Sequence, residues 1–263
     1  MIEFREMAET DVSTVIELID SHDEDDAEEA QATYEESLEH HYVLTLDQQV
    51  IGVTGFKPIP HSNKSCWLSW TYVHKRHCGN GYGRKLLQKL LQVLNELEAR
   101  KIFVKTSDYC DPEDGPIYAA ALHLYQSIGF EIEVELADFY DEGEKMIILG
   151  YNLQSDVVAS DVEEVAAPIR FNDIFEIAET TGSYCFGWEM KGRKHFDAED
   201  LEIGINAVKD KGGRCVFLTF PSNLPEIHKP MQEAGFQYFG QLADYYDVGI
   251  HELHFGYQLT GNT

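Results

Sequence analysis

The stretch that most constrains this chain runs from an apolar strand through three glycines into a helix. Residues 67–73 are apolar and aromatic, which is typical of a buried strand. Glycines follow at Gly79, Gly81 and Gly83. Leucines then recur at helical spacing, at Leu86, Leu87, Leu90, Leu91, Leu94 and Leu97. A strand, a glycine loop and a helix in this order present main-chain N–H groups at a helix N-terminus, which predicts a phosphate or pyrophosphate site.

The composition limits the partners of such a site. The 263 residues are enough for one large domain or two ordinary ones, and 43% are hydrophobic, which is enough for a core. A net charge of −27 argues against nucleic acid as a ligand, because binding a phosphate backbone needs a basic face. An acidic surface favours cationic ligands, and the alternative is that the charge serves solubility alone. The acidic start has no signal-peptide stretch, and no apolar run approaches the ~20 residues that span a bilayer. We therefore expect a cytoplasmic protein without a membrane partner.

The cysteines predict neither a disulfide framework nor a metal site. The chain has five, an odd and scattered set without a C-x-x-C pair. They are Cys66, Cys78, Cys110, Cys185 and Cys215. We expect reduced thiols and no bound metal.

Hydrophobic periodicity predicts a definite order of elements over residues 2–153: strand, two helices, three strands, helix, strand, helix, two strands. Strands are expected at 2–5, 41–46, 50–57, 66–73, 101–106, 130–137 and 145–153. Helices are expected at 12–19, through Tyr34 and Leu38, from Arg84 along the leucines, and at 117–128. Gly129 then stands in the position of a helix C-terminal cap.

The second half of the chain partly repeats the first. Residues 154–168 have linker composition, and several segments then recur at a constant offset of 106. Gly129-Phe130 recurs as Gly235-Phe236, residues 136–143 recur as 242–249, and residues 150–153 recur as 256–259. The pattern predicts a domain at 1–153, a linker at 154–168 and a trimmed copy at 169–263.

A dinucleotide-binding site is one interpretation of the glycine loop. In that arrangement the glycines follow the strand directly, and an acidic residue closes the next strand ~20 residues on. Here five residues, His74 to Cys78, separate the strand from Gly79, and the only candidate acid, Asp108, lies far downstream. The preceding elements also start no βαβ unit, so this interpretation is disfavoured.

Three features together resemble the GNAT superfamily of acyl-CoA-dependent N-acyltransferases. They are the strand ending in Trp70-Thr-Tyr-Val73, the glycine loop entering a helix at Arg84, and Ala121-Leu-His-Leu-Tyr125-Gln-Ser-Ile-Gly129-Phe130. The family's loop reads Arg/Gln-x-x-Gly-x-Gly/Ala, and this chain departs from it by having Cys78 at the first position. The resemblance covers residues 2–153. It implies an α/β (α+β) fold with a mixed, mostly antiparallel central sheet flanked by helices.

The resemblance also implies a reaction and its residues. The pyrophosphate of acetyl-CoA, the co-substrate, would bind at Gly79, Asn80, Gly81, Tyr82, Gly83 and Arg84, and the pantetheine arm at the main chain of Tyr72, Val73 and His74. Tyr125 would protonate the departing CoA thiolate, for which a phenol near pKa 10 is a suitable donor. The alternative for Tyr125 is a buried aromatic that packs the helix. The reaction would move an acetyl or short acyl group to a primary amine by direct attack in a ternary complex.

The second half lacks both features. Met231 stands at the position equivalent to Tyr125. Residues 191–195, which contain a single glycine, stand in place of the glycine loop. We therefore expect the chemistry in the first half. The basic residues of the replacement, Lys191, Arg193 and Lys194, would form a solvated loop or reach a CoA phosphate.

The acceptor is the least defined part of the prediction. His74, Asp108, Asp138 and Glu35 are candidate bases by residue type only. In the family, the segment after the first helix borders the acceptor site, and here it contains the acidic residues 23–29. We hypothesise that they attract a small cationic amine, against the alternative of a solvated acidic loop. A non-catalytic acyl-CoA-binding or interaction module and a protein N-acetyltransferase remain as other functions, and the chain would be a monomer or a homodimer.

Overall fold

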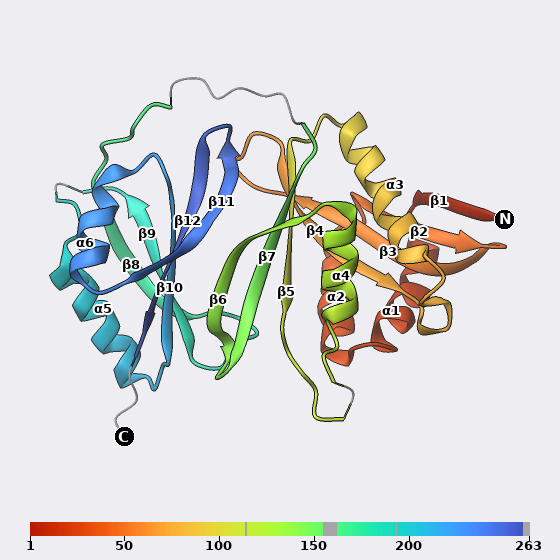
Figure 1. Cartoon of the computed structure of the whole chain (residues 1–263), viewed down its shortest axis with the longest axis horizontal. Helices are drawn as coiled ribbons and strands as arrows, with labels where there is room; N and C mark the ends of the chain where they lie inside the picture. The colour runs from red at the N-terminus through yellow and green to blue at the C-terminus, as the bar shows by residue number, and fades with distance from the viewer. Residues whose placement is uncertain (114, 155–161, 193, 260–263) are drawn as a thin grey trace. The chain divides into compact units, whose positions relative to one another are not determined.

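The computed structural model describes residues 1–113, 115–154, 162–192 and 194–259 (Figure 1). The chain divides into two compact units. The first comprises Met1–Val104, His123–Phe130 and Tyr151–Ser155, and the second Lys105–Leu122, Glu131–Gly150 and Asp156–Thr263. Each contains a sheet with flanking helices, which confirms the predicted mixed α/β fold. Among the described residues no helix is both long enough and apolar enough to cross a membrane.

The sheet of the first unit has the order β1-β2-β3-β4-β5. Its strands are β1 (Ile2–Glu6), β2 (His41–Leu46), β3 (Gln49–Pro58), β4 (Ser65–Val73) and the Lys101–Val104 part of β5 (Lys101–Ser107). All neighbours are antiparallel except β4 and β5, which are parallel. Asp47 and Gln48, both at positive φ (48° and 71°), form the turn between β2 and β3, with the backbone that tight hairpins favour.

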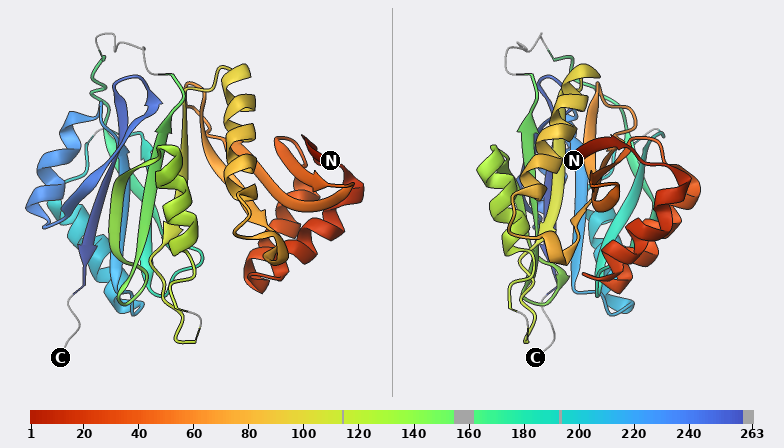
Figure 2. Two further views of the ribbon diagram at one scale, coloured as in Figure 1. Left: turned by 45° about the vertical axis from the view of Figure 1, so that its right-hand side comes forward. Right: turned by 90° about the vertical axis from the view of Figure 1, so that its right-hand side faces the viewer.

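Helices cover both faces of this sheet (Figure 2). They are α1 (Val12–Asp20), α2 (Glu24–Glu36), α3 (Tyr82–Glu96) and the part of α4 (Ala119–Ile128) from His123 on. Val43 and Leu44 are neighbours on β2 and point to opposite faces. Val43 packs with α1 and α2, and Leu44 packs with Leu86 of α3.

Two details of the predicted helices are corrected. Leu97 was expected on the buried leucine stripe of α3, but it follows the end of the helix and is 51% exposed. The acidic segment was expected to precede the second helix. Instead Asp23 is the N-cap of α2, its carboxylate accepts from the Asp26 N–H at 3.1 Å, and Glu24, Asp25 and Asp26 form the first turn. Acidic residues are stabilising there because they face the positive end of the helix dipole.

The sheet of the second unit has the order β7-β6-β11-β12-β10-β9-β8. The strands are β6 (Glu131–Asp141), β7 (Glu144–Asn152, up to Gly150 in this unit), β8 (Ile169–Glu176), β9 (Ser183–Met190), β10 (Cys215–Pro221), β11 (Gln237–Asp247) and β12 (Ile250–Gln258). Its helices α5 (Ala198–Asp210) and α6 (His228–Glu233) cover a core that includes Phe186, Phe220 and Met231. Only β9 and β10 are parallel.

The predicted sequence repeat coincides with a repeated strand register. Glu131 pairs with Gly150 and Gln237 with Gly256, and the two irregularities along β6–β7 recur in β11–β12 at the same offset. Asp138 and Asp244 both have φ 54°. Their carboxylates accept from the N–H groups of Gly143 at 2.7 Å and Gly249 at 2.8 Å. A repeated pattern of side chains therefore makes the same turn twice.

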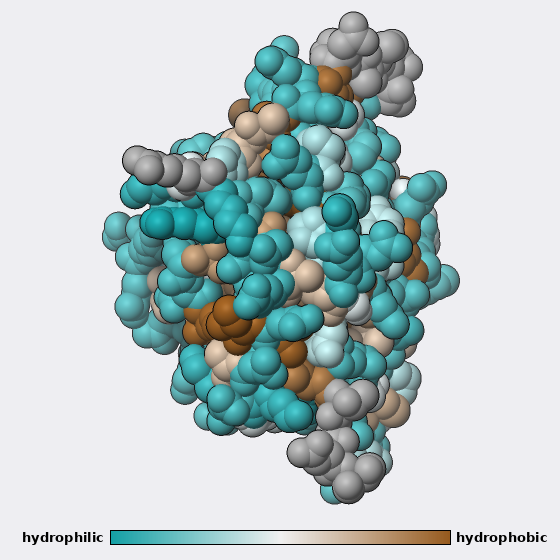
Figure 3. Space-filling view, turned by 90° about the vertical axis from the view of Figure 1, so that its left-hand side faces the viewer, coloured by the Kyte–Doolittle hydropathy of each residue, from teal (hydrophilic) through white to brown (hydrophobic). Residues whose placement is uncertain are grey.

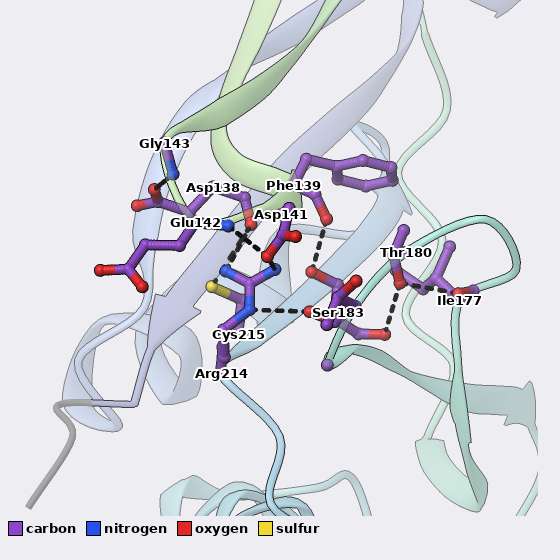
Figure 4. Close-up of polar contacts among 12 residues, drawn as sticks. Asp138, Phe139, Asp141, Glu142, Gly143, Ile177, Thr180, Ser183, Arg214 and Cys215 are labelled. Carbon is purple, nitrogen blue, oxygen red and sulfur yellow. Dashed lines mark hydrogen bonds and ion pairs between the residues drawn. The ribbon is translucent and has the colours of Figure 1, made fainter. Parts of the chain in front are cut away.

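The connection before β9 also repeats the one before β4. Thr180 donates its hydroxyl hydrogen toward the carbonyls of Ile177 (2.7 Å) and Ser183 (3.3 Å) (Figure 4). Ser62 makes the same contacts with the carbonyls of Ile59 (2.8 Å) and Ser65 (3.3 Å). In each half an arginine Nε then binds the next loop carbonyl, Arg214 to Thr181 and Arg100 to Asn63. The second half thus reproduces main-chain contacts of the first.

Candidate active site

At its carboxyl end, beside the glycine loop, β4 is paired with a neighbouring strand on one edge only among the described residues. Trp70 and Thr71 together oppose the single residue Thr54 of β3, which is a β-bulge that bends β4. Beyond it, the His74 N–H donates to the Ile51 carbonyl at 2.9 Å. Main-chain groups alternate between the edges of an antiparallel strand, so those of Val73 point away from β3. Along that edge, the pairing with β5 covers Ser65–Trp67.

The glycine loop ends in a helix N-terminus without a side-chain cap. Gly79 (φ 77°) and Gly81 (φ 79°) have left-handed backbones, and a Cβ built on either meets no atom within 4 Å. Gly81 is the N-cap of α3, and the first turn contains no acidic residue. The first N–H groups of a helix have no acceptor within it, and here no carboxylate competes for them. The residues present therefore fit a pyrophosphate group.

Arg84 connects this helix to α4. Its guanidinium donates to the carbonyl of Ser127 at 3.2 Å and to its Oγ at 2.7 Å. A Cβ on Gly83 would lie 3.0 Å from Cδ2 of Leu124, so the two helices approach closely there. Leu124 and Ser127 flank Tyr125. The structure thus brings the predicted acid and the predicted pyrophosphate loop into one packed unit, and it gives Arg84 a structural role in addition to the predicted ligand contact.

Tyr125 lies on the buried side of α4 and is 8% exposed. Its ring is 5.7 Å from that of Phe130, and its carbonyl accepts the N–H of Gly129 at 3.2 Å and of Phe130 at 3.1 Å, which ends the helix. Burial raises the pKa of the phenol to about 12. The hydroxyl is therefore protonated at neutral pH, as a proton donor must be.

A group missed by the sequence reasoning lies at the carboxyl end of β4. The Tyr72 hydroxyl donates to the carboxylate of Asp26 on α2. His22, in the turn before α2, places Nε2 2.9 Å from the carbonyl oxygen of Val73. The rings of His22 and Tyr72 are 5.4 Å apart. The acidic residues of this segment are evident in the sequence. No sequence pattern indicates that His22 contacts β4.

The four candidate bases are engaged in other contacts. His74 Nδ1 accepts from the Arg76 N–H at 3.2 Å, and Glu35 accepts from Gln31 at 2.9 Å. Asp108 accepts from the Lys145 N–H at 2.8 Å, and Asp138 from the Gly143 N–H at 2.7 Å. Each carboxylate or ring nitrogen thus stabilises a turn, a helix surface or a strand end.

The corresponding helix of the second half is closed to an anion. Asp197 is the N-cap of α5, and its carboxylate accepts from the Asp200 N–H at 3.1 Å while that of Asp200 accepts from the Asp197 N–H at 3.0 Å. Lys194 donates to Asp197 at 2.6 Å. Arg193 lies outside the described residues. The positive helix end is therefore already occupied by side-chain carboxylates.

The second unit contains a cavity of about 610 Å³. Phe171, Phe196 and Ile203 form its apolar wall, and Arg170, Lys194 and Lys211 add charge. Figure 3 shows apolar patches on a face of the molecule that is otherwise largely hydrophilic. In the first half, Leu46 of β2 and Phe4 of β1 pack at the corresponding side of α3. No strands with this role precede β8 among the described residues, so the second half leaves this side of α5 open.

The five cysteines are free in the structure. Burial raises the pKa of the Cys66 thiol to about 12 and that of Cys185 to about 11, so both are protonated. No group of three or more His, Cys, Asp or Glu residues that could hold a metal is found in the described part of the chain.

The first part of the chain is similar to known acetyltransferases. The sequence profile of the acetyltransferase (GNAT) family matches residues 5–130. The spermine/spermidine N(1)-acetyltransferase of Bacillus subtilis (strain 168) is 28% identical over 131 residues, which cover 46% of this chain and 79% of that protein.

A solved structure gives the same result for the fold. A GNAT-family protein from Desulfovibrio desulfuricans is 24% identical, superposes with a TM-score of 0.53, and covers 59% of this chain and 100% of its own. The resemblance inferred from the glycine loop and from Tyr125 to Phe130 agrees with the match to the acetyltransferase (GNAT) family over residues 5–130.

Proposed function

We propose that the chain transfers an acetyl or other short acyl group from acetyl-CoA to a primary amine of a small cationic molecule. The observation that carries this proposal is the uncapped N-terminus of α3 behind Gly79 and Gly81, with Tyr125 on the helix packed against it. The first-turn N–H groups would bind the pyrophosphate, and the outward main chain of Val73 the pantetheine arm. The amine would attack the thioester directly, and Tyr125 would give its proton to the departing thiolate.

The acceptor class is supported by the charge beside the strand. Glu24, Asp25 and Asp26 form the first turn of α2, and Asp26 contacts Tyr72 on β4. The relative from Bacillus subtilis is named for spermine and spermidine, which are polycations. Carboxylates at this position would raise the local concentration of a cationic amine. We propose a polyamine-like acceptor on these grounds.

Release of free CoA thiol from acetyl-CoA across a panel of amines tests the proposal. The panel contains polyamines, aminosugars, neutral amines and N-terminal peptides. Turnover that is fastest with the polyamines supports it. Turnover confined to peptides would make the chain a protein N-acetyltransferase. Stabilisation by acetyl-CoA without turnover would indicate an acyl-CoA-binding module, and no thermal shift with acetyl-CoA would contradict the donor site itself.

Neutralising the acidic turn is expected to weaken the acceptor alone. In a triple variant with Asp23→Asn, Asp25→Asn and Asp26→Asn, KM for a dicationic amine should rise about tenfold, which corresponds to ~1.4 kcal/mol. KM for acetyl-CoA should stay unchanged. Asn at position 23 still caps a helix, so α2 should persist. Steady-state kinetics at low ionic strength measure the effect, and an unchanged KM for the amine would contradict the proposed role.

We propose the same division of the chain as the sequence predicts, with the acetyltransferase domain at 1–153, a linker at 154–168 and a degenerate GNAT-like copy at 169–263. The repeated register of β11–β12 supports the copy, and the carboxylate cap of α5 supports its loss of donor binding. We also propose a cytoplasmic location and a monomer or homodimer, with the internal repeat favouring the monomer.

A further inference from the structure

The imidazole of His22 contacts the outward edge of β4. Its Nε2 lies 2.9 Å from the Val73 carbonyl oxygen, 51 residues away in the sequence. Val73 directs this carbonyl away from β3, on the edge where the proposed donor arm would lie. His22 therefore occupies the point at which the acceptor-side turn between α1 and α2 meets the donor strand.

The contact with Val73 fixes the tautomer of the ring. A carbonyl oxygen can only accept, so Nε2 carries the hydrogen. In the neutral ring Nδ1 is then the acceptor, and it has no hydrogen-bond partner among the described residues. Burial lowers the pKa of His22, and the charges of Lys75 and His74 lower it further, while the Val73 carbonyl raises it. Because its pKa is lowered, the His22 ring is neutral at neutral pH and keeps a lone pair at Nδ1.

The surroundings of His22 are suited to an ammonium group. Asp23 follows it in the sequence, the tilted ring of Tyr72 lies 5.4 Å away, and Asp26 contacts the hydroxyl of that tyrosine. Lys75 and His74 follow β4 in the sequence and lie close enough to His22 to lower its pKa. A cationic amine held by the α2 carboxylates would therefore meet the imidazole before it reaches the thioester.

We propose that His22 is the general base that removes a proton from the acceptor ammonium. The inference rests on the proposed acyl transfer. Nδ1 takes one proton from R–NH₃⁺, and the amine nitrogen then forms a bond to the thioester carbon. The C–S bond breaks with its electron pair on sulfur, and Tyr125 gives its proton to that sulfur. The phenolate takes the second amine proton, and His22 releases its own to solvent.

His22→Gln tests this role because the amide can still donate to the Val73 carbonyl but has no basic lone pair. We expect kcat/KM for the amine to fall about 100-fold, within the range of general base catalysis. In the wild type, kcat/KM should fall as the pH drops through a pKa below 6.5, because the protonated ring cannot accept. The variant should lose this acidic limb. His22→Ala should regain activity with added imidazole, and His61→Gln, another exposed histidine, should match the wild type.

Nitrogen-15 NMR of the imidazoles provides a readout independent of turnover. It should show His22 as the Nε2–H tautomer with a lowered pKa. If His22→Gln turns over as fast as the wild type with an unchanged pH profile, the proposal that His22 is the general base is wrong. The proposed acyl transfer would still stand. Tighter acetyl-CoA binding with the same profile would also overturn the proposed base and indicate that His22 blocks the donor edge. Absence of turnover with every amine would overturn both proposals.

Discussion

Tyr125→Phe is expected to lower kcat by between about 100- and 10,000-fold, the range of a lost general acid. The affinity for acetyl-CoA should change little. The thiolate needs a proton as the C–S bond breaks, and burial keeps the phenol protonated by raising its pKa to about 12. The substitution removes one oxygen and leaves the ring that packs on Phe130 at 5.7 Å. Steady-state kinetics with a saturating amine measure kcat, and calorimetry measures the affinity for acetyl-CoA. Together they separate the effect on the reaction from the effect on donor binding.

Tyr34→Phe is the matched control. Tyr34 is also a buried tyrosine on a helix, and its hydroxyl has no hydrogen-bond partner in the part of the chain that the structure describes. Removing that oxygen leaves no donor or acceptor unsatisfied, so stability and activity should both be retained. A loss in Tyr125→Phe no larger than that in Tyr34→Phe would make Tyr125 a packing residue, which is the alternative that its sequence position left open.

Local sequence patterns were sufficient to predict the helices, the strands and the glycine loop. The leucine spacing of α3, the turn at Asp47 and Gln48, and the Gly129 stop each depend on a few neighbouring residues. The contacts on which the proposed chemistry rests are of another kind. Arg84 meets Ser127 across 43 residues, and His22 meets Val73 across 51. Such contacts follow from how the helices pack on the sheet, and no local spacing encodes them.

The acidic turn of α2 illustrates a signal that was present in the sequence. Asp23 followed three residues later by Asp26, with acids between them, is a pattern of a helix N-terminus. The same signal at Asp197 and Asp200 marks the start of α5. A capping box at the position of a glycine loop already predicts that the second half cannot bind a pyrophosphate there. The capping residues of α5 therefore indicate, from the sequence alone, how the second half differs from the first. The contact between Asp26 and Tyr72 could be found only from the fold.

The largest effect on donor binding is expected from Gly81→Val. A Cβ at this position meets no atom of the protein within 4 Å, so the new side chain does not clash with the fold. It would stand in the space over the first turn of α3, where the pyrophosphate is proposed to bind. We expect the Kd for acetyl-CoA to rise at least 100-fold, which corresponds to ~2.7 kcal/mol. Isothermal titration calorimetry measures this directly.

Backbone strain has to be separated from the loss of the ligand site, and Gly212→Val does so. Gly212 has the same φ as Gly81, 79°, and a Cβ there also meets nothing within 4 Å. An L-residue in the left-handed region costs about 1–2 kcal/mol, so both variants should be destabilised to a similar extent in denaturant unfolding. Only Gly81→Val should lose acetyl-CoA binding, because Gly212 follows α5 in the half whose helix end is capped by Asp197. Equal losses of binding in the two variants would mean that strain, and not occupation of the phosphate site, is responsible.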